Sequence, residues 1–118
     1  MYFYSVRGAT CIKNNDKNEI DLATRQLLLE IMAVNGIEKD QIVQIIFSAT
    51  RDITKMYPAE AARNMGIVDA SLLCLQEMYV EGSLPFCIRI LMNFSSDVRV
   101  KVKHVYLNEA KKLRPDLQ

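Results

Sequence analysis

Two apolar runs separated by a short break constrain this chain more strongly than any other part of its sequence. The first run covers residues 72–80 and the second covers residues 86–94, with Gly82 and Pro85 in the break between them. Both runs are rich in residues that favour β-strands, and both are far shorter than a membrane span. Because each predicted strand is apolar on both faces, we expect one face to pack beneath helices and the other against neighbouring subunits.

Arg89 lies at the centre of the second run, with apolar neighbours on both sides. Strand alternation places Arg89 on one face with Cys87 and Leu91, and places the other apolar residues of the run on the opposite face. A cation in this setting is costly unless an anionic group meets it, and Glu77 near the end of the first run is a suitable partner. Taken alone, the pattern favours a buried structural ion pair or an arginine that faces solvent.

The composition indicates a small globular protein of near-neutral charge. Its 118 residues are half hydrophobic and a quarter charged, with a formal net charge of +1; this length predicts one domain, residues 1–118. The basic residues are scattered, so no nucleic-acid surface is expected. No run is long enough to span a membrane, and the first residues lack the features of a signal peptide. Three cysteines suit a reducing compartment, so we expect a cytoplasmic protein.

Local patterns predict an α+β fold with a mixed β-sheet and helices on one face. The predicted elements are a strand at residues 2–7 ending at Gly8, a helix at 19–35 ended by Gly36, a strand at 41–49, a short helix from Pro58 to Gly66, strands at 72–80, 86–94 and 102–107, and a polar tail at 108–118. The order of strands and helices supports the α+β assignment. The polar composition of the tail predicts mobility until a ligand binds.

Conventional catalytic chemistry has few candidate residues in this sequence. His104 is the one histidine and no CxxC or HExxH spacing occurs, so no metal site is expected. No serine lies in a nucleophile elbow, and a Cys–His pair would depend on His104 in an ordinary strand. What remains is a set of arginines with one acid and two tyrosines: Arg7, Arg63, Arg89, Arg114, Glu77, Tyr57 and Tyr106. Guanidinium binds carboxylate bidentately, so this set favours a site for a small dicarboxylate.

Six short sequence blocks add a resemblance to these observations. They are Val6-Arg7-Gly8-Ala9-Thr10; Ser48-Ala49-Thr50 with Tyr57-Pro58-Ala59 and Ala62-Arg63; Cys74-Leu75-Gln76-Glu77-Met78; Cys87-Ile88-Arg89; His104-Val105-Tyr106-Leu107; and Leu113-Arg114-Pro115-Asp116. In order and extent they resemble the small monofunctional chorismate mutases of the trimeric, pseudo-α/β-barrel class. The resemblance implies a homotrimer with active sites between adjacent subunits. It also implies conversion of chorismate to prephenate without a cofactor, in the shikimate pathway of aromatic amino acid biosynthesis.

The resemblance also implies a role for each matching residue. Arg89 and Glu77 are the implied catalytic residues: Arg89 lies beside the breaking ether oxygen, and Glu77 accepts a hydrogen bond from the ring hydroxyl, helped by the Cys74 region. Arg7 and Tyr106 are expected to bind carboxylates. Tyr57 is expected to pack on the ligand from the neighbouring subunit, with Arg63 and Arg114 at the cleft mouth. The implied substrate-binding set is Arg7, Tyr57, Arg63, Leu72, Leu73, Cys74, Tyr106, Leu113 and Arg114.

Three positions depart from the family pattern. Tyr57 stands where phenylalanine is familiar, Glu60 stands where lysine is common, and Leu73 stands where a small hydroxylated residue is expected. The first change keeps the ring, the second removes an attractive charge at the entrance, and the third removes a hydrogen-bonding group. We expect these departures to affect affinity more than activity.

The implied reaction agrees with the residues that the chain lacks. A Claisen rearrangement is intramolecular and pericyclic, so it needs neither a nucleophile nor a proton shuttle. The protein must hold a flexible dianion in its reactive conformer and stabilise the charge separation of the transition state. Arg89 would face the oxygen as it becomes negative, and Glu77 would lie towards the ring as it becomes positive.

Two other functions remain open from the sequence. The Rid-type imine deaminases have a similar trimeric fold and a comparable final strand that ends in Val-Tyr-Leu, and they would release ammonia from an imino acid. A non-catalytic trimer that binds a carboxylate metabolite could use the same arginines, and it would bind chorismate without turnover.

Overall fold

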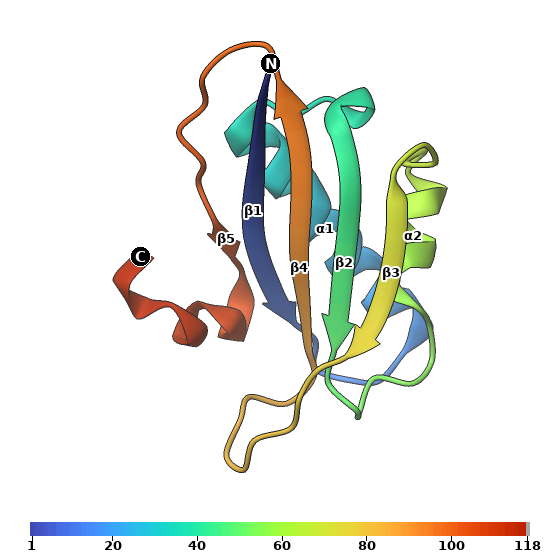
Figure 1. The fold of residues 1–118 in the computed structure, drawn as a ribbon. Coiled ribbons are helices and arrows are strands. Elements are labelled where there is room, and N and C mark those ends of the chain that lie inside the picture. The colour runs from blue at the N-terminus through green and yellow to red at the C-terminus, as the bar shows by residue number, and fades with distance from the viewer. Residues whose placement is uncertain (118) are drawn as a thin grey trace.

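The computed structural model describes residues 1–117, which form one mixed β-sheet with helices on one face (Figure 1). Within this range the sheet has five strands in the order β3-β2-β4-β1-β5. The strands are β1 (Tyr2–Cys11), β2 (Ile42–Ala49), β3 (Ser71–Gln76), β4 (Cys87–Ser96) and β5 (Val105–Tyr106). The helices are α1 (Lys17–Asn35) and α2 (Pro58–Asn64), with short 3₁₀ segments η1 (Lys39–Gln41), η2 (Asn108–Leu113) and η3 (Pro115–Leu117). The α+β fold predicted from the sequence is confirmed.

The central strand β4 runs antiparallel to both of its neighbours, β1 and β2. The two edge strands are parallel to the strands they join, β3 to β2 and β5 to β1. Parallel neighbours require a crossover connection, and α2 lies in the connection between β2 and β3. The sheet is therefore mixed: its central strands pair antiparallel, and each edge strand pairs in parallel with its neighbour.

Helix α1 begins and ends at the residues that the sequence pattern indicates. The Asp16 side chain accepts a hydrogen bond from the Glu19 backbone N–H at 3.0 Å, which caps the first turn. Gly36 ends the helix in the left-handed conformation with φ 63°. Ile20 and Ile31 on the apolar side of the helix are fully buried against the sheet. The predicted helix 19–35 is confirmed, with its start two residues earlier at Lys17.

Alternation along β4 divides the sheet into a covered face and an open face. Ile88, Ile90 and Met92 are buried on the covered face, beneath the helices. Arg89 and Leu91 are half-buried on the opposite face, as the alternation predicts. We call this opposite face the open face, because among the described residues only η2, near β1, packs against it.

The open face exposes large apolar side chains. Phe3 on β1 is 72% exposed, and Leu73 and Leu75 on β3 are 53% and 49% exposed. Ile46 on β2 lies between Leu73 and Leu91 in the register, so the exposed apolar residues continue across the sheet. An apolar surface of this extent is typical of a face that contacts another protein.

Two predicted strands are shorter in the structure than in the sequence pattern. The run 72–80 forms β3 only as far as Gln76, because the Glu77 backbone N–H makes the final ladder bond to the Ala49 carbonyl at 2.9 Å and no strand lies beyond it. The predicted strand 102–107 pairs only at Val105–Tyr106. The preceding Lys103 backbone is instead held by the side chain of Asn35, at the end of α1.

The prediction that the first strand ends at Gly8 is wrong, because β1 continues to Cys11. Gly8 faces α1 at very short range: a Cβ there would lie 2.7 Å from Cδ1 of Ile31 and 3.1 Å from the carbonyl oxygen of Val105. Glycine is therefore required by close packing within a strand and does not mark a turn.

The tail predicted to be mobile forms η2 and η3, and η2 packs on the open face. Ala110 in η2 is fully buried against Ala9 and Tyr106. The sequence pattern did not predict this contact, because one small apolar residue in a mostly polar segment makes it. Gln118, the last residue of the predicted tail, lies outside the described residues.

Candidate active site

Arg89 and Glu77 meet on the open face. Arg89 Nε lies 3.3 Å from Glu77 Oε1, and the two side chains are 26% and 25% exposed. The contact is an ion pair without the alignment of a hydrogen bond, so the buried Nε–H of Arg89 has no hydrogen-bond acceptor among residues 1–117. An unsatisfied buried donor costs about 1–3 kcal/mol. The position therefore favours an additional acceptor, such as a ligand oxygen.

Ser48 fixes the carboxylate of Glu77. Its hydroxyl donates to Glu77 Oε1, the same oxygen that faces Arg89. Ser48 and Arg89 are register partners on β2 and β4, so the acid lies across two neighbouring strands. The sequence analysis gave Ser48 no role. The sequence could have indicated this role, because Ser48 lies at the end of an apolar run, two residues after Ile46 on the same strand face. A hydroxyl in that position needs a hydrogen-bond partner.

Arg7 and Tyr106 lie on the same face as Arg89. Arg7 is the register partner of Leu91 on β4, and its side chain is exposed. Its backbone N–H donates to His104 Nδ1 at 3.0 Å, which fixes this part of β1. Tyr106 is the register partner of Ala9, which itself lies opposite Arg89. The two predicted carboxylate binders therefore flank Arg89 across β1.

The tail brings Leu113 and Arg114 close to Tyr106. Leu113 packs with the buried cluster of Ala9 and Tyr106. Arg114 makes two contacts with Asp116, Nη2 to Oδ2 at 2.9 Å and Nε to Oδ1 at 3.1 Å. The hydrogen bonds that Arg114 donates to Asp116, and then the charge of Asp116, raise the pKa of Arg114, and Tyr106 contributes to this shift. Arg114 is thus a permanent cation held near Tyr106.

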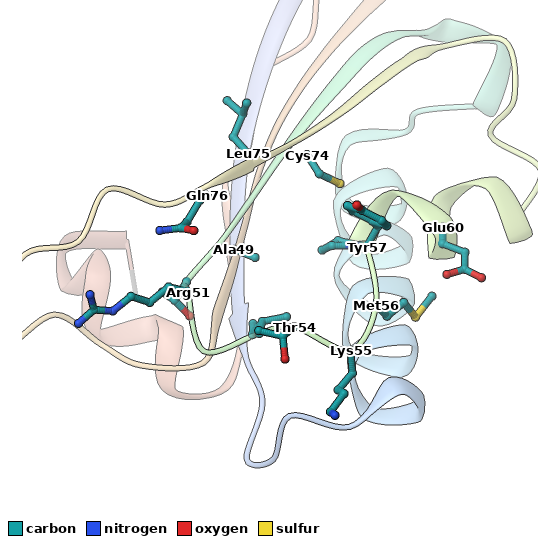
Figure 2. Close-up of a pocket in the computed structure, with 13 residues that line it drawn as sticks. Ala49, Arg51, Thr54, Lys55, Met56, Tyr57, Glu60, Cys74, Leu75 and Gln76 are labelled. Carbon is teal, nitrogen blue, oxygen red and sulfur yellow. The ribbon is translucent and has the colours of Figure 1, made fainter.

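Tyr57 and Cys74 line a different cavity, at the outer edge of β3 (Figure 2). This cavity of about 480 Å³, which we call the edge pocket, is lined by residues that include Arg51, Lys55, Met56, Tyr57, Glu60 and Cys74. Cys74 points towards Tyr57, whereas Leu75 points to the other side of the strand. Burial raises the pKa of the Cys74 thiol, while the Ala59 backbone and the Arg63 charge on α2 partly oppose the shift.

The structure separates Cys74 from Glu77. Cys74 is the register partner of Phe47, which is fully buried beneath the helices, whereas Glu77 contacts Ser48 on the open face. Within one chain, Cys74 therefore does not contact the Glu77 carboxylate that it was expected to help. Leu72 and Leu73 are divided in the same way: Leu72 packs towards the core, and Leu73 is exposed on the open face.

The predicted site residues thus form two groups within one chain. The open-face group contains Arg7, Leu73, Glu77, Arg89, Tyr106, Leu113 and Arg114. The edge group contains Tyr57, Arg63, Leu72 and Cys74, from α2, its preceding loop and the inner side of β3. Each group contains residue types suited to a carboxylate ligand, and neither encloses one.

The arrangement contains no conventional catalytic pair. Among residues 1–117, no three His, Cys, Asp or Glu side chains gather where they could hold a metal ion. No helix in that range is both long and apolar enough to span a membrane. What the open face offers for catalysis is a fixed cation, Arg89, beside a fixed anion, Glu77.

Residues 3–117 match the sequence model of chorismate mutase type I, which is nearly the entire chain. The chain belongs to the type I chorismate mutase family. Its activity is therefore isomerisation of chorismate to prephenate, within aromatic amino acid biosynthesis.

Relatives of known family support this assignment along the whole chain. The chorismate mutase AroH of Thermus thermophilus is 43% identical over 115 residues, covering 96% of this chain and 94% of that protein. The chorismate mutase AroH of Bacillus subtilis is 39% identical over 119 residues, covering 99% and 94%. A solved chorismate mutase structure from Clostridium thermocellum superposes with a TM-score of 0.89 at 45% identity, covering 92% of this chain and 98% of that one. The chain therefore resembles other type I chorismate mutases in both sequence and fold.

Proposed function

We propose that the chain rearranges chorismate to prephenate in a cleft that two copies build together. The open-face group of one copy supplies Arg89 and Glu77, and the edge pocket of the next copy supplies Tyr57 and Cys74. The observation that carries this proposal is the separation of the two groups within one chain. Tyr57 is 71% exposed, which suits a ring that packs on a ligand held by another copy.

Arg89 acts on the ether oxygen of the substrate. Within residues 1–117 its buried Nε–H has no hydrogen-bond acceptor, and its strand is paired on both sides. As the carbon–oxygen bond breaks, the oxygen gains negative charge and becomes a better acceptor than it was in the ground state. A donor already in place for that charge stabilises the transition state selectively.

Glu77 acts on the ring side of the substrate. Ser48 and the Arg89 guanidinium hold the carboxylate on the open face. There the acid accepts a hydrogen bond from the ring hydroxyl and lies towards the positive charge that develops on the ring. The anion and the cation thus match the two ends of the charge separation.

The remaining arginines hold the two substrate carboxylates. Arg7 lies near Arg89 on the adjacent strand, and Arg114 lies beside Tyr106 on the tail. Arg63 on α2 of the adjacent copy adds a further cation at the cleft mouth. Charge-assisted and bidentate contacts of this kind restrict a flexible dianion to one folded conformer. Chemistry then requires no proton transfer.

The assembly that we propose for this site is the homotrimer that the family resemblance implies. A contact between an open face and an edge pocket is heterologous, so it closes only as a ring of subunits. The exposed Phe3, Leu73 and Leu75 would be covered in that ring. We further propose that residues 1–118 act as one domain in the cytoplasm, where the three cysteines stay mainly reduced.

Subunit mixing tests the shared cleft. Arg89→Lys damages only the open face, and the double variant Tyr57→Ala with Arg63→Ala damages only the edge pocket. When the two are co-expressed and the mixed trimers are purified away from the two homotrimers, each mixed trimer carries one cleft with two intact halves out of three, so turnover should return to about a third of the parent value. Mixing Arg89→Lys with Glu77→Gln is the matched control and should restore nothing, because both changes lie in the same half. Activity equal to the sum of the parents would reject the shared site.

Membership of the type I chorismate mutase family decides against the two alternatives that the sequence left open, a Rid-type imine deaminase and a non-catalytic trimer that binds a carboxylate metabolite.

A further inference from the structure

Cys11 and Cys87 form a pair that the rearrangement does not use. Cys11 ends β1, Cys87 begins β4, and the two lie opposite each other in the antiparallel register. The Ile12 backbone N–H donates to the Phe86 carbonyl at 2.9 Å, which identifies the cysteines as a non-hydrogen-bonded pair. In such pairs the Cα atoms lie about 4.5 Å apart and the side chains are closest. A disulfide requires Cα atoms about 4.4–6.8 Å apart, so the existing register suits one.

The two thiols differ in their tendency to ionise. A hydrogen bond between them raises the pKa of Cys11, and burial adds to that rise. The same hydrogen bond lowers the pKa of Cys87, and the nearby positive charge of Arg89 lowers it further against the effect of burial. Because the thiolate is the reactive form, a contact that favours ionisation of one thiol of the pair favours its oxidation.

Access to the pair is from the Cys11 side. Cys87 is 1% exposed, whereas Cys11 is half-buried. Cys11 lines a hollow of about 330 Å³ whose other walls include Glu19, Gln26 and Glu109. A small-molecule oxidant can enter this hollow more readily than the disulfide of another protein can.

We propose that Cys11 and Cys87 are a reversible oxidation site through which a hydroperoxide slows the enzyme. The thiolate of one cysteine attacks one oxygen of hydrogen peroxide, the O–O bond breaks, and that cysteine becomes a sulfenic acid while hydroxide leaves and is protonated to water. The sulfur of the other cysteine then attacks the sulfenic sulfur, and a second water leaves as the S–S bond forms. Two thiols lose two electrons and one peroxide gains them.

The site is coupled to Arg89 by position. Arg89 lies two residues after Cys87 on the same face of β4, and its register partner Ala9 lies two residues before Cys11. Cys11 also packs with the cluster of Ala9, Tyr106 and Leu113 beneath the tail. A covalent bond at the next pair on the same face therefore changes how β1 packs against β4 beside Arg89. Since a misplacement of about 1 Å can cost about 10²-fold in rate, we expect kcat to fall about tenfold or more.

The test treats the purified reduced enzyme with hydrogen peroxide, blocks free thiols, and maps disulfides by peptide mass while chorismate turnover is measured in the same sample. We expect a Cys11–Cys87 disulfide, a fall in kcat, and recovery of both with dithiothreitol. Cys11→Ser is the matched variant: it keeps Cys87 and the basal turnover, and it should form no intramolecular disulfide. Cys74 serves as the internal reference, because burial raises its pKa and it lies across the sheet.

Three results would overturn the proposal: no Cys11–Cys87 disulfide, a disulfide that preferentially includes Cys74, or a mapped Cys11–Cys87 disulfide with unchanged kcat. The effect on kcat rests on the proposed function of Arg89, whereas the mapped disulfide does not. If the reduced enzyme failed to turn over chorismate, the proposed function would fail, and the peptide masses would still decide whether the pair oxidises.

Discussion

The open-face group and the edge pocket are built from different kinds of structure. Arg89 and Ser48 lie in register on neighbouring strands and both contact Glu77. The edge pocket is lined mainly by the loop between β2 and α2, and Tyr57 in that loop is 71% exposed. The first region holds charges in fixed positions, and the second offers an adaptable surface.

This difference separates two tasks of the enzyme. Fixed charges act most strongly where charge develops, so changes on the open face should mainly lower kcat. An adaptable surface binds substrate and transition state about equally, so changes in the edge pocket should mainly raise KM. Measuring both constants for variants on each side tests the division directly.

Arg89→Lys should have the largest effect. Lysine keeps the charge but lacks the Nε–H and the planar fork, so kcat should fall about 10²–10³-fold while KM changes little. Steady-state kinetics of the folded variant measures both. Arg25→Lys is the matched control, because Arg25 Nε contacts Asp21 Oδ2 at 2.9 Å on α1, away from both groups. If Arg89→Lys retained most of its kcat, Arg89 would be a structural residue only.

Ser48→Ala should have the next largest effect. It removes the hydroxyl that orients Glu77, and a hydrogen bond to a charged group contributes about 1.5–3 kcal/mol, so kcat should fall about ten- to a hundredfold. Ser48→Thr keeps the hydroxyl and should recover most of the rate. Ser5→Ala removes a comparable bond, Ser5 Oγ to Asn93 Oδ1 at 2.6 Å on the same face, and should leave kcat unchanged. Equal losses from Ser5→Ala and Ser48→Ala would point to general damage to the sheet.

Tyr57→Ala should raise KM about tenfold and change kcat by much less, because burying an aromatic ring against a ligand contributes about 1.5–3 kcal/mol of uniform binding. Its thermal unfolding should match that of the parent, since the side chain is exposed. Tyr57→Phe keeps the ring and should behave like the parent. A loss confined to kcat would contradict the division between the two regions.

Glu60→Lys should have the smallest effect. Glu60 lines the edge pocket, and a cation there would attract a dianionic substrate, so KM should fall a few-fold at low salt and the gain should disappear as salt screens it. Glu30→Lys, an exposed change on α1, gives the same change of net charge away from the pocket. A salt-independent gain, or an equal gain from Glu30→Lys, would exclude the local effect.

The secondary structure was largely predictable where local chemistry determines it. The caps Asp16 and Gly36 mark α1, and alternation marks both faces of β4. The ends of β3 and β5 were not predictable, because a strand ends where its partner ends, and the partner is distant in sequence. Gly8 was misread for the same reason: the atoms that require a glycine belong to α1 and β5.

The contacts among the candidate site residues were predictable only in part. The meeting of Arg89 with Glu77 followed from the cost of an unpaired cation in an apolar strand. The separation of Cys74 from Glu77 agrees with their odd spacing of three residues in the predicted strand, but the resemblance assigned both residues to one site and gave no face to either. Ser48 was missed because its partner lies in a segment that the sequence pattern assigned to a longer strand.

The position of Glu77 just beyond the end of β3 has a consequence for how fast the enzyme can cycle. Arg89 lies within a strand paired on both sides, whereas Glu77 begins a loop that contains Gly82 and exposes Met78 and Tyr79. Segments with few buried contacts open locally at low free-energy cost. Opening of this loop would move Glu77 away from the site and leave Arg89 in place. The rate of loop opening would then set both how long the product stays bound and how long the acid stays in position. Amide exchange at Glu77, compared with that at Arg89, measures it.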